Sequence, residues 1–315
     1  MRPASADPYD PALRDLIDAA VSQLCDRLRR SMPLSGTSVL EWMRQLAGGS
    51  DPAAYYHHLR GSPMFVFPWA LEKALNGVPD LPAQFDLVYS TISGYYWVRL
   101  IDNLTDHQST NELDLLPALG LFHTEFQRPY QARFPATHPF WEFFTATWFH
   151  SADVTMADLH PGDMEREQFV QVAAQKICAI KIPLAALCYG YDRPGLLPEW
   201  SSFIDLFGCW HQMSNDLFHW YEDEQDGTLT YLLAEAERCK HRAETITDWV
   251  VRKGFSWAMG LLDAWMYDLQ RRTRSMDSRD LMRYLQFRDA LLHRDADETL
   301  EALRLAPGIT GMFVE

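Results

Sequence analysis

The sequence predicts an all-α fold with a single helical domain, and three observations lead to this prediction. No stretch sustains the alternation of polar and apolar residues that is typical of a half-buried strand. Long patterns with helical spacing fill most of the chain, and proline and glycine separate them, as at residues 77–79 and 193–195. Asn76-Gly77 follows one of these patterns, so we expect it to end a helix rather than to turn a hairpin.

The expected helices follow one another without a linker long enough to divide two domains. We therefore predict one helical domain over residues 9–305, with residues 1–8 and 306–315 as frayed termini. The helices that we expect run over residues 11–30, 36–47, 63–75, 83–107, 112–127, 138–151, 163–190, 198–224, 228–239, 241–252, 254–273 and 278–304.

The amino-acid composition indicates the general class of protein. Of the 315 residues 47% are hydrophobic and 23% are charged, which is typical of a soluble globular chain with a core. No run of about 18 uncharged apolar residues is present, and the N-terminus lacks the apolar stretch of a secretory signal, so we expect no membrane span. The five cysteines are odd in number and form no CxxC pair, which favours a reduced, cytoplasmic setting without a disulfide framework or zinc site.

The net charge of -15 argues against nucleic acid as a partner. It also bears on any anionic substrate, because acidic side chains would repel an anion unless metal ions lie between them.

A first candidate motif lies in the last turn of the expected helix over residues 83–107. This helix is apolar nearly all round until its last turn, where Asp102 and Asp106 stand at i and i+4. The helix dipole disfavours anions at a C-terminal end, so these carboxylates need a cation or hydrogen-bond donors.

A second candidate motif closes the expected helix over 198–224. Asn215, His219 and Asp223 stand at i, i+4 and i+8, which stacks them on one helix face. Asp216 and Glu222 are placed off this face, and Glu224 is a weaker rival to Asp223. Upstream on the same helix, Gly208 would let a neighbouring helix or a ligand approach closely. Two helices that each aim oxygen ligands along one face are suited to hold divalent cations and, through them, a diphosphate ester.

The spacing of these motifs resembles that of the class I isoprenoid synthases, which comprise terpene cyclases and their prenyltransferase relatives. Asp102 and Asp106 match the ends of a D(D/N)xxD motif, with Asn103 at its second position. Asn215 and Asp216 match the start of an (N/D)Dxx(S/T)xxxE motif. His219 stands where Ser or Thr is usual, and Asp223 stands where Glu is usual. The following segment EDEQDGTLTYLL also looks like the family's continuation.

The resemblance implies a helical bundle around a deep apolar cavity, with a cluster of Mg²⁺ held by Asp102, Asp106, Asn215, His219 and Asp223. Imidazole is a poorer ligand for Mg²⁺ than oxygen. That leaves open whether His219 binds the diphosphate directly, whether the site holds fewer ions, or whether its ion preference differs.

The resemblance also implies basic residues that bind the diphosphate. Lys176 and Lys181 are the only cations in the otherwise apolar stretch 171–190 and lie five residues apart, so their faces differ by about 140° and one of them is expected to reach the site. Arg283-Tyr284 resembles the pair that caps the diphosphate in cyclases. Arg99, one turn before Asp102, is either structural or a further contact.

Aromatic side chains are abundant and give candidates for the cavity wall, where ring faces would stabilise a carbocation. The candidates are Tyr95, Tyr96, Trp97, Phe65, Trp69, Trp210 and Phe218.

The function expected from the resemblance is a Mg²⁺-dependent terpene cyclase, a lyase that ionises an allylic isoprenyl diphosphate and cyclises the cation. Two alternatives stay open: a prenyltransferase that couples two isoprenoid diphosphates, and a non-catalytic isoprenoid-binding protein. A homodimer is a further expectation, because dimers are common in the family. Chain length and product depend on the cavity's contour, which residue identities do not fix.

Overall fold

The computed structural model describes residues 9–58, 62–105, 114–158 and 164–305. Over these residues every regular element is a helix and no strand is present, so the all-α prediction is confirmed. The expected termini 1–8 and 306–315 lie outside the described residues, as does Asp106.

The chain divides into two compact units, and each is assembled from segments that are distant in sequence. Unit 1 comprises Met1–Glu142 and Pro183–Pro194, and unit 2 comprises Phe143–Ile182 and Gly195–Glu315. Their three boundaries fall inside α6 (Phe140–Asp158), α8 (Lys181–Gly190) and the 3₁₀ turn η4 (Pro194–Leu196). The two candidate motifs therefore belong to different units, Asp102 to unit 1 and Asn215 to unit 2.

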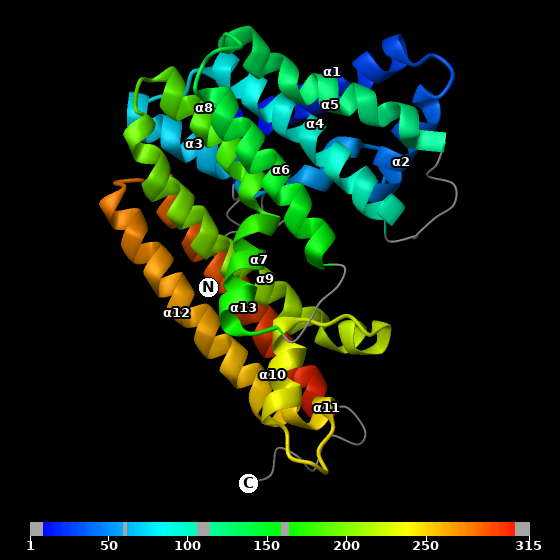
Figure 1. Ribbon diagram of the computed structural model, residues 1–315, viewed down its shortest axis with the longest axis vertical. Coiled ribbons are helices and arrows are strands. Elements are labelled where there is room, and N and C mark those ends of the chain that lie inside the picture. The colour runs from blue at the N-terminus through cyan, green and yellow to red at the C-terminus, as the bar shows by residue number, and fades with distance from the viewer. Residues whose placement is uncertain (1–8, 59–61, 106–113, 159–163, 306–315) are drawn as a thin grey trace. The chain divides into compact units, whose positions relative to one another are not determined.

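Unit 1 is built around one long apolar helix, which carries the first motif. This helix, α4, packs against α1, α3 and α5, and Figure 1 shows α4 and α5 running side by side. Ser90 Oγ of α4 donates a hydrogen bond to the Phe126 carbonyl at 2.6 Å, and a Cβ at Gly94 would lie only 2.9 Å from the Phe126 ring. The elements of unit 1 are α1 (Pro11–Ser31), α2 (Gly36–Leu46), the 3₁₀ turn η1 (Pro52–His57), α3 (Pro63–Asn76), α4 (Leu81–Thr105), α5 (Leu116–Arg133) and most of α8.

Unit 2 is likewise built around one long helix, α9, which carries the second motif. This helix packs against α7, α10 and α12. It begins with Pro198 in its first turn and ends at Asp226. Gly227 caps it, with a φ of 70° that is the left-handed conformation glycine adopts without strain. The elements of unit 2 are most of α6, α7 (Arg166–Lys176), η3 (Cys178–Ile180), α9 (Leu197–Asp226), α10 (Tyr231–Cys239), α11 (Ile246–Trp249), the π-helical turn η5 (Val250–Gly254), α12 (Phe255–Ser275) and α13 (Arg279–Leu305).

Two glycine predictions are confirmed. Helix α3 ends at Asn76 and is capped by Gly77, whose φ is 76°. A Cβ at Gly208 would lie 2.7 Å from the Ala173 carbonyl oxygen and 3.0 Å from the Ile177 side chain, so glycine is what lets α7 and α9 approach this closely.

One expected helix is broken. Residues 163–190 were expected to form a single helix, but α7 ends at Lys176 and a 3₁₀ turn precedes α8. Pro183 explains the break, because proline has no backbone N–H to donate back along the helix and its ring crowds the carbonyl of residue 179. Pro183 is tolerated in the first turn of α8, where no such donor is required.

Among the described residues no single helix has both the length and the hydrophobicity to cross a membrane, although the bent pair Arg166–Lys176 and Cys178–Gly190 passes that test when taken together.

Candidate functional site

The second motif occupies the last three turns of α9. His219 is exposed, whereas Asn215 and Asp223 are half-buried. The Nδ1 atom of His219 lies 3.0 Å from the carbonyl oxygen of Asn215. Since a carbonyl only accepts, Nδ1 carries the hydrogen, and Nε2 is the ring atom that remains for a ligand.

Asp223 lies in an acidic environment. Burial raises the pKa of its carboxyl group, and the neighbouring carboxylates of Glu222 and Asp226 raise that pKa further, against the opposing attraction of His219 and Lys176. A carboxylate crowded in this way gains from a bound cation. Glu222 is exposed, as expected for a residue off the motif's face.

Asp216 is the buried acid of this helix, with only 3% of its surface exposed. Its Oδ1 atom accepts a hydrogen bond from Gln212 Nε2 at 2.8 Å. Burial raises the pKa of Asp216 to about 7, while the hydrogen bond from Gln212 and the charge of Lys176 act to lower it. The sequence placed Asp216 off the motif's face, and the structure buries it inside unit 2.

The two candidate lysines have different partners. Lys176, the last residue of α7, is exposed, and its charge acts on both Asp216 and Asp223. The Lys181 ammonium lies 2.5 Å from a carboxylate oxygen of Asp205. Asp205 precedes Asn215 by ten residues, or about 15 Å of helix. Within unit 2, Lys176 is therefore the lysine that is electrostatically coupled to the second motif.

The Arg283-Tyr284 pair of α13 is split between the surface and the interior. The side chain of Arg283 is 61% exposed and lies 3.9 Å from Asp280, whereas Tyr284 is buried. Arg288, one turn further on, is the buried cation of this face and donates a hydrogen bond to the Tyr284 hydroxyl at 2.9 Å. Its guanidinium carbon lies 5.1 Å from the centre of the Trp210 ring.

Sequence reasoning missed Arg288, although a signal for it was present. Tyr284, Arg288 and Leu292 stand at i, i+4 and i+8 and are all buried. A cation in the apolar stripe of a helix needs an interior partner, and here the partners are aromatic ring faces. The guanidinium carbon of Arg288 also lies 5.8 Å from the ring centres of Phe207 and Tyr284.

The first motif is described only in part, because Asp106 lies outside the described residues. Asp102 is half-buried and Asn103 is buried near the end of α4. Arg99 is half-buried, and its charge opposes the burial that raises the pKa of Tyr95.

The remaining aromatic candidates pack mainly against other rings. Tyr96 is buried beside Trp42 and Phe122, with ring centres 5.8 and 5.6 Å away. Phe65 and Trp69 are buried in unit 1, Trp97 is half-buried beside His123, and Phe218 is half-buried beside Phe255. The deep apolar cavity stays a prediction.

A scan of protein-family models and a search of curated proteins find no match to this chain.

Proposed function

We propose that this chain is a Mg²⁺-dependent terpene cyclase that ionises an allylic isoprenyl diphosphate. One observation supports the proposal most directly. In unit 2, α9 carries an amide, an imidazole and a carboxylate on successive turns of one face, and Lys176 of the neighbouring helix acts electrostatically on the same turns. Metal ligands beside a cation are the chemistry that a diphosphate requires.

The side chains present fit a magnesium ion. Asn215 and Asp223 offer oxygen atoms, which hard cations prefer, and Asp223 is crowded by other carboxylates. When bound, Mg²⁺ neutralises the diphosphate and makes it a better leaving group.

The chain's own groups would do the rest of the chemistry. Lys176 would bind the departing diphosphate, and Lys181 would do so less well, because its charge is already paired with Asp205. His219 would present Nε2, either as a ligand or, when protonated, as a donor to a phosphate oxygen. Aromatic faces would stabilise the carbocation, and the released diphosphate would accept the final proton.

Incubation with farnesyl or geranylgeranyl diphosphate and Mg²⁺ tests the proposal. We expect a hydrocarbon or alcohol product and one diphosphate released per substrate. Asp223→Asn should lower turnover by about a hundredfold or more, because an amide is a weaker cation ligand than a carboxylate. Asp15→Asn, which makes the same change at an exposed acid of α1, should leave turnover unchanged.

The other outcomes point to the alternatives. Turnover only after a second isoprenoid diphosphate is added would favour a coupling enzyme. Binding of the diphosphate without turnover, and without any dependence on Mg²⁺, would favour a binding protein. Full activity of Asp223→Asn would overturn the metal site on α9.

A further inference from the structure

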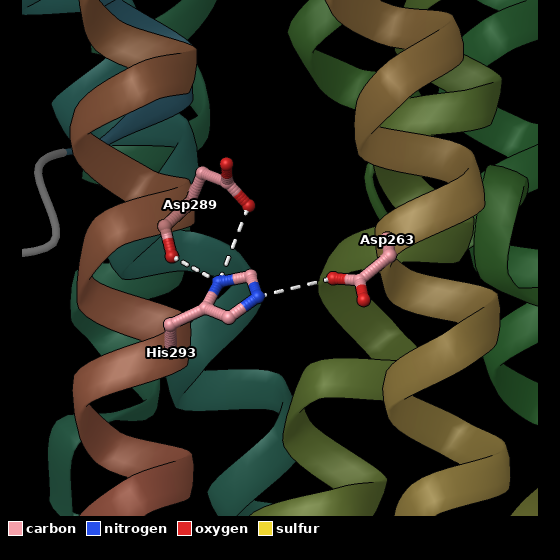
Figure 2. A group of neighbouring side chains, drawn as sticks. All are labelled: Asp263, Asp289 and His293. Atoms are coloured by element: carbon pink, nitrogen blue, oxygen red, sulfur yellow. Dashed lines mark hydrogen bonds and ion pairs between the residues drawn. The ribbon is translucent and has the colours of Figure 1, made fainter.

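A second cluster of metal-ligand side chains lies in unit 2 on α12 and α13, whereas the proposed ligands Asn215, His219 and Asp223 lie on α9. Asp263 comes from α12, and Asp289 and His293 come from the adjacent helix α13, one turn apart. Figure 2 shows the imidazole of His293 lying between the two acids, with Nδ1 toward Asp289 and Nε2 toward Asp263. Each residue offers a ligand atom, and these atoms all lie within 4.8 Å of one another.

The hydrogen bonding of His293 fixes the tautomer of its ring. Its Nδ1 atom lies 3.0 Å from the carbonyl oxygen of Asp289, which only accepts, so Nδ1 carries the hydrogen. In the neutral ring Nε2 then presents a lone pair to Asp263, whose Oδ1 atom is 3.3 Å away. A backbone acceptor on one ring nitrogen, with the other nitrogen aimed at a ligand, is the arrangement that orients metal-binding histidines.

Two lone-pair donors that face each other at this distance repel unless a cation lies with them. A proton on Nε2 is one solution, and a metal ion that binds both groups is the other. The carboxylate of Asp289 approaches the same ring, with Oδ1 3.5 Å from Nδ1.

The cluster has room to close around an ion. The side chains of Asp263 and His293 are 54% and 51% exposed, and that of Asp289 is 33% exposed, so each is able to change rotamer at the surface. Bonds of about 2.0–2.2 Å place the ligands of a tetrahedral ion about 3.4 Å apart. The 3.3 Å between Nε2 and Asp263 already matches this spacing, and Asp289 has the larger movement to make.

We propose that Asp263, Asp289 and His293 form a binding site for a divalent transition-metal ion of the zinc class, with water as its remaining ligand. The imidazole nitrogen selects this class over Mg²⁺, which prefers oxygen. The ion would join α12 to α13. It would therefore stabilise the folded chain, because the unfolded chain does not hold these three groups together.

Titration of the chelator-treated protein with ZnCl₂, followed by calorimetry and by thermal unfolding, tests this site. We expect one zinc-dependent increase in Tm that MgCl₂ does not reproduce. His293→Ala and Asp263→Asn should each weaken zinc binding by at least about tenfold, since removal of a ligand should cost no less than removal of its outer hydrogen-bond partner.

Two control variants separate this site from other histidines. His241→Ala removes an exposed imidazole elsewhere in unit 2, and His219→Ala removes the imidazole of α9. Zinc binding at the α12–α13 cluster should survive both changes. Wild-type protein that binds no zinc, or zinc binding that is lost in His219→Ala and kept in His293→Ala, would overturn the proposal. Neither outcome depends on whether the chain acts on isoprenyl diphosphates.

Discussion

The Lys181 ammonium lies 2.5 Å from the Asp205 carboxylate, and this ion pair joins the first residue of α8 to α9. Lys176, five residues earlier, instead acts on the acids of the second motif. Two lysines that look alike in one apolar stretch of sequence thus have separate physical roles. Lys181 holds a structural contact, and Lys176 supplies positive charge beside Asp216 and Asp223.

Matched substitutions of the two lysines should therefore rank in opposite orders for stability and for diphosphate binding. Lys181→Ala should lower the free energy of unfolding by about 1 kcal/mol, a modest loss because Asp205 is 38% exposed and water screens the pair. Lys176→Ala should cost less than Lys181→Ala, because Lys176 is exposed and water screens its charge. Urea unfolding measures both. Under the proposed function, Lys176→Ala should weaken inorganic diphosphate binding more than Lys181→Ala, and the reverse order would assign the anion contact to Lys181.

Arg288 should prove to be the structural arginine of α13. Arg288→Ala removes a buried side chain, the donor to the Tyr284 hydroxyl and the cation over the Trp210 ring, so we expect a loss of about 2–4 kcal/mol. Arg283→Ala, at a side chain that is 61% exposed, should change stability by no more than about 0.5 kcal/mol. Chemical denaturation of the pair checks this, and equal losses would show that the orientation of α13 is different.

The sequence was sufficient to predict most of the helices, because each has a pattern and a stop signal. Apolar spacing placed α9 over nearly its whole length, with residues 198–224 expected and Leu197–Asp226 observed. The break before α8 was missed as a boundary, since the apolar pattern runs through it and only Pro183 opposes it. The turn η1 was not expected either, because a six-residue 3₁₀ segment leaves little periodic signal.

The candidate site was predictable along each helix but not between helices. The stacking of Asn215, His219 and Asp223 follows from helical spacing alone. The partner of Lys181 does not, because Asp205 lies on another helix, and nothing in the chain order pairs them. Likewise the Arg283-Tyr284 motif is a local pattern, whereas the burial of Tyr284 and Arg288 depends on how α13 packs.

Gly208 should be required for the close approach of α7 and α9. Gly208→Ala would place a Cβ 2.7 Å from the Ala173 carbonyl oxygen, a backbone atom that moves only with its helix, so we expect a loss of about 1–3 kcal/mol. Gly260→Ala is the matched control, because a Cβ at this exposed position of α12 meets nothing within 4 Å. It should stabilise the protein by about 0.5–1 kcal/mol. Thermal unfolding shows whether each variant loses or gains stability. A stabilised Gly208→Ala variant would contradict the packing of α7 on α9.

Asp216 should make the stability of this chain fall as the pH rises from about 4 to 7. Its pKa is about 7 in the folded protein, against 3.8 as the ordinary value. Between these pH values the folded state keeps a proton that the unfolded chain has released. The stabilisation of the folded state by this proton is therefore fully present below pH 3.8 and is lost as the pH rises through about 7. It amounts to about 4 kcal/mol at most.

Asp216→Asn removes this dependence, because an amide does not ionise and still offers an oxygen to Gln212. We expect the variant to gain stability relative to the wild type as the pH rises, with the largest gain near pH 8. Urea unfolding at pH 4.5, 6 and 8 without divalent ions measures the difference, and Asp15→Asn controls for the loss of an exposed acid. The difference in the free energy of unfolding between Asp216→Asn and the wild type could instead stay constant across this pH range. That result would mean that Asp216 is already ionised in the folded protein, with Lys176 compensating its charge.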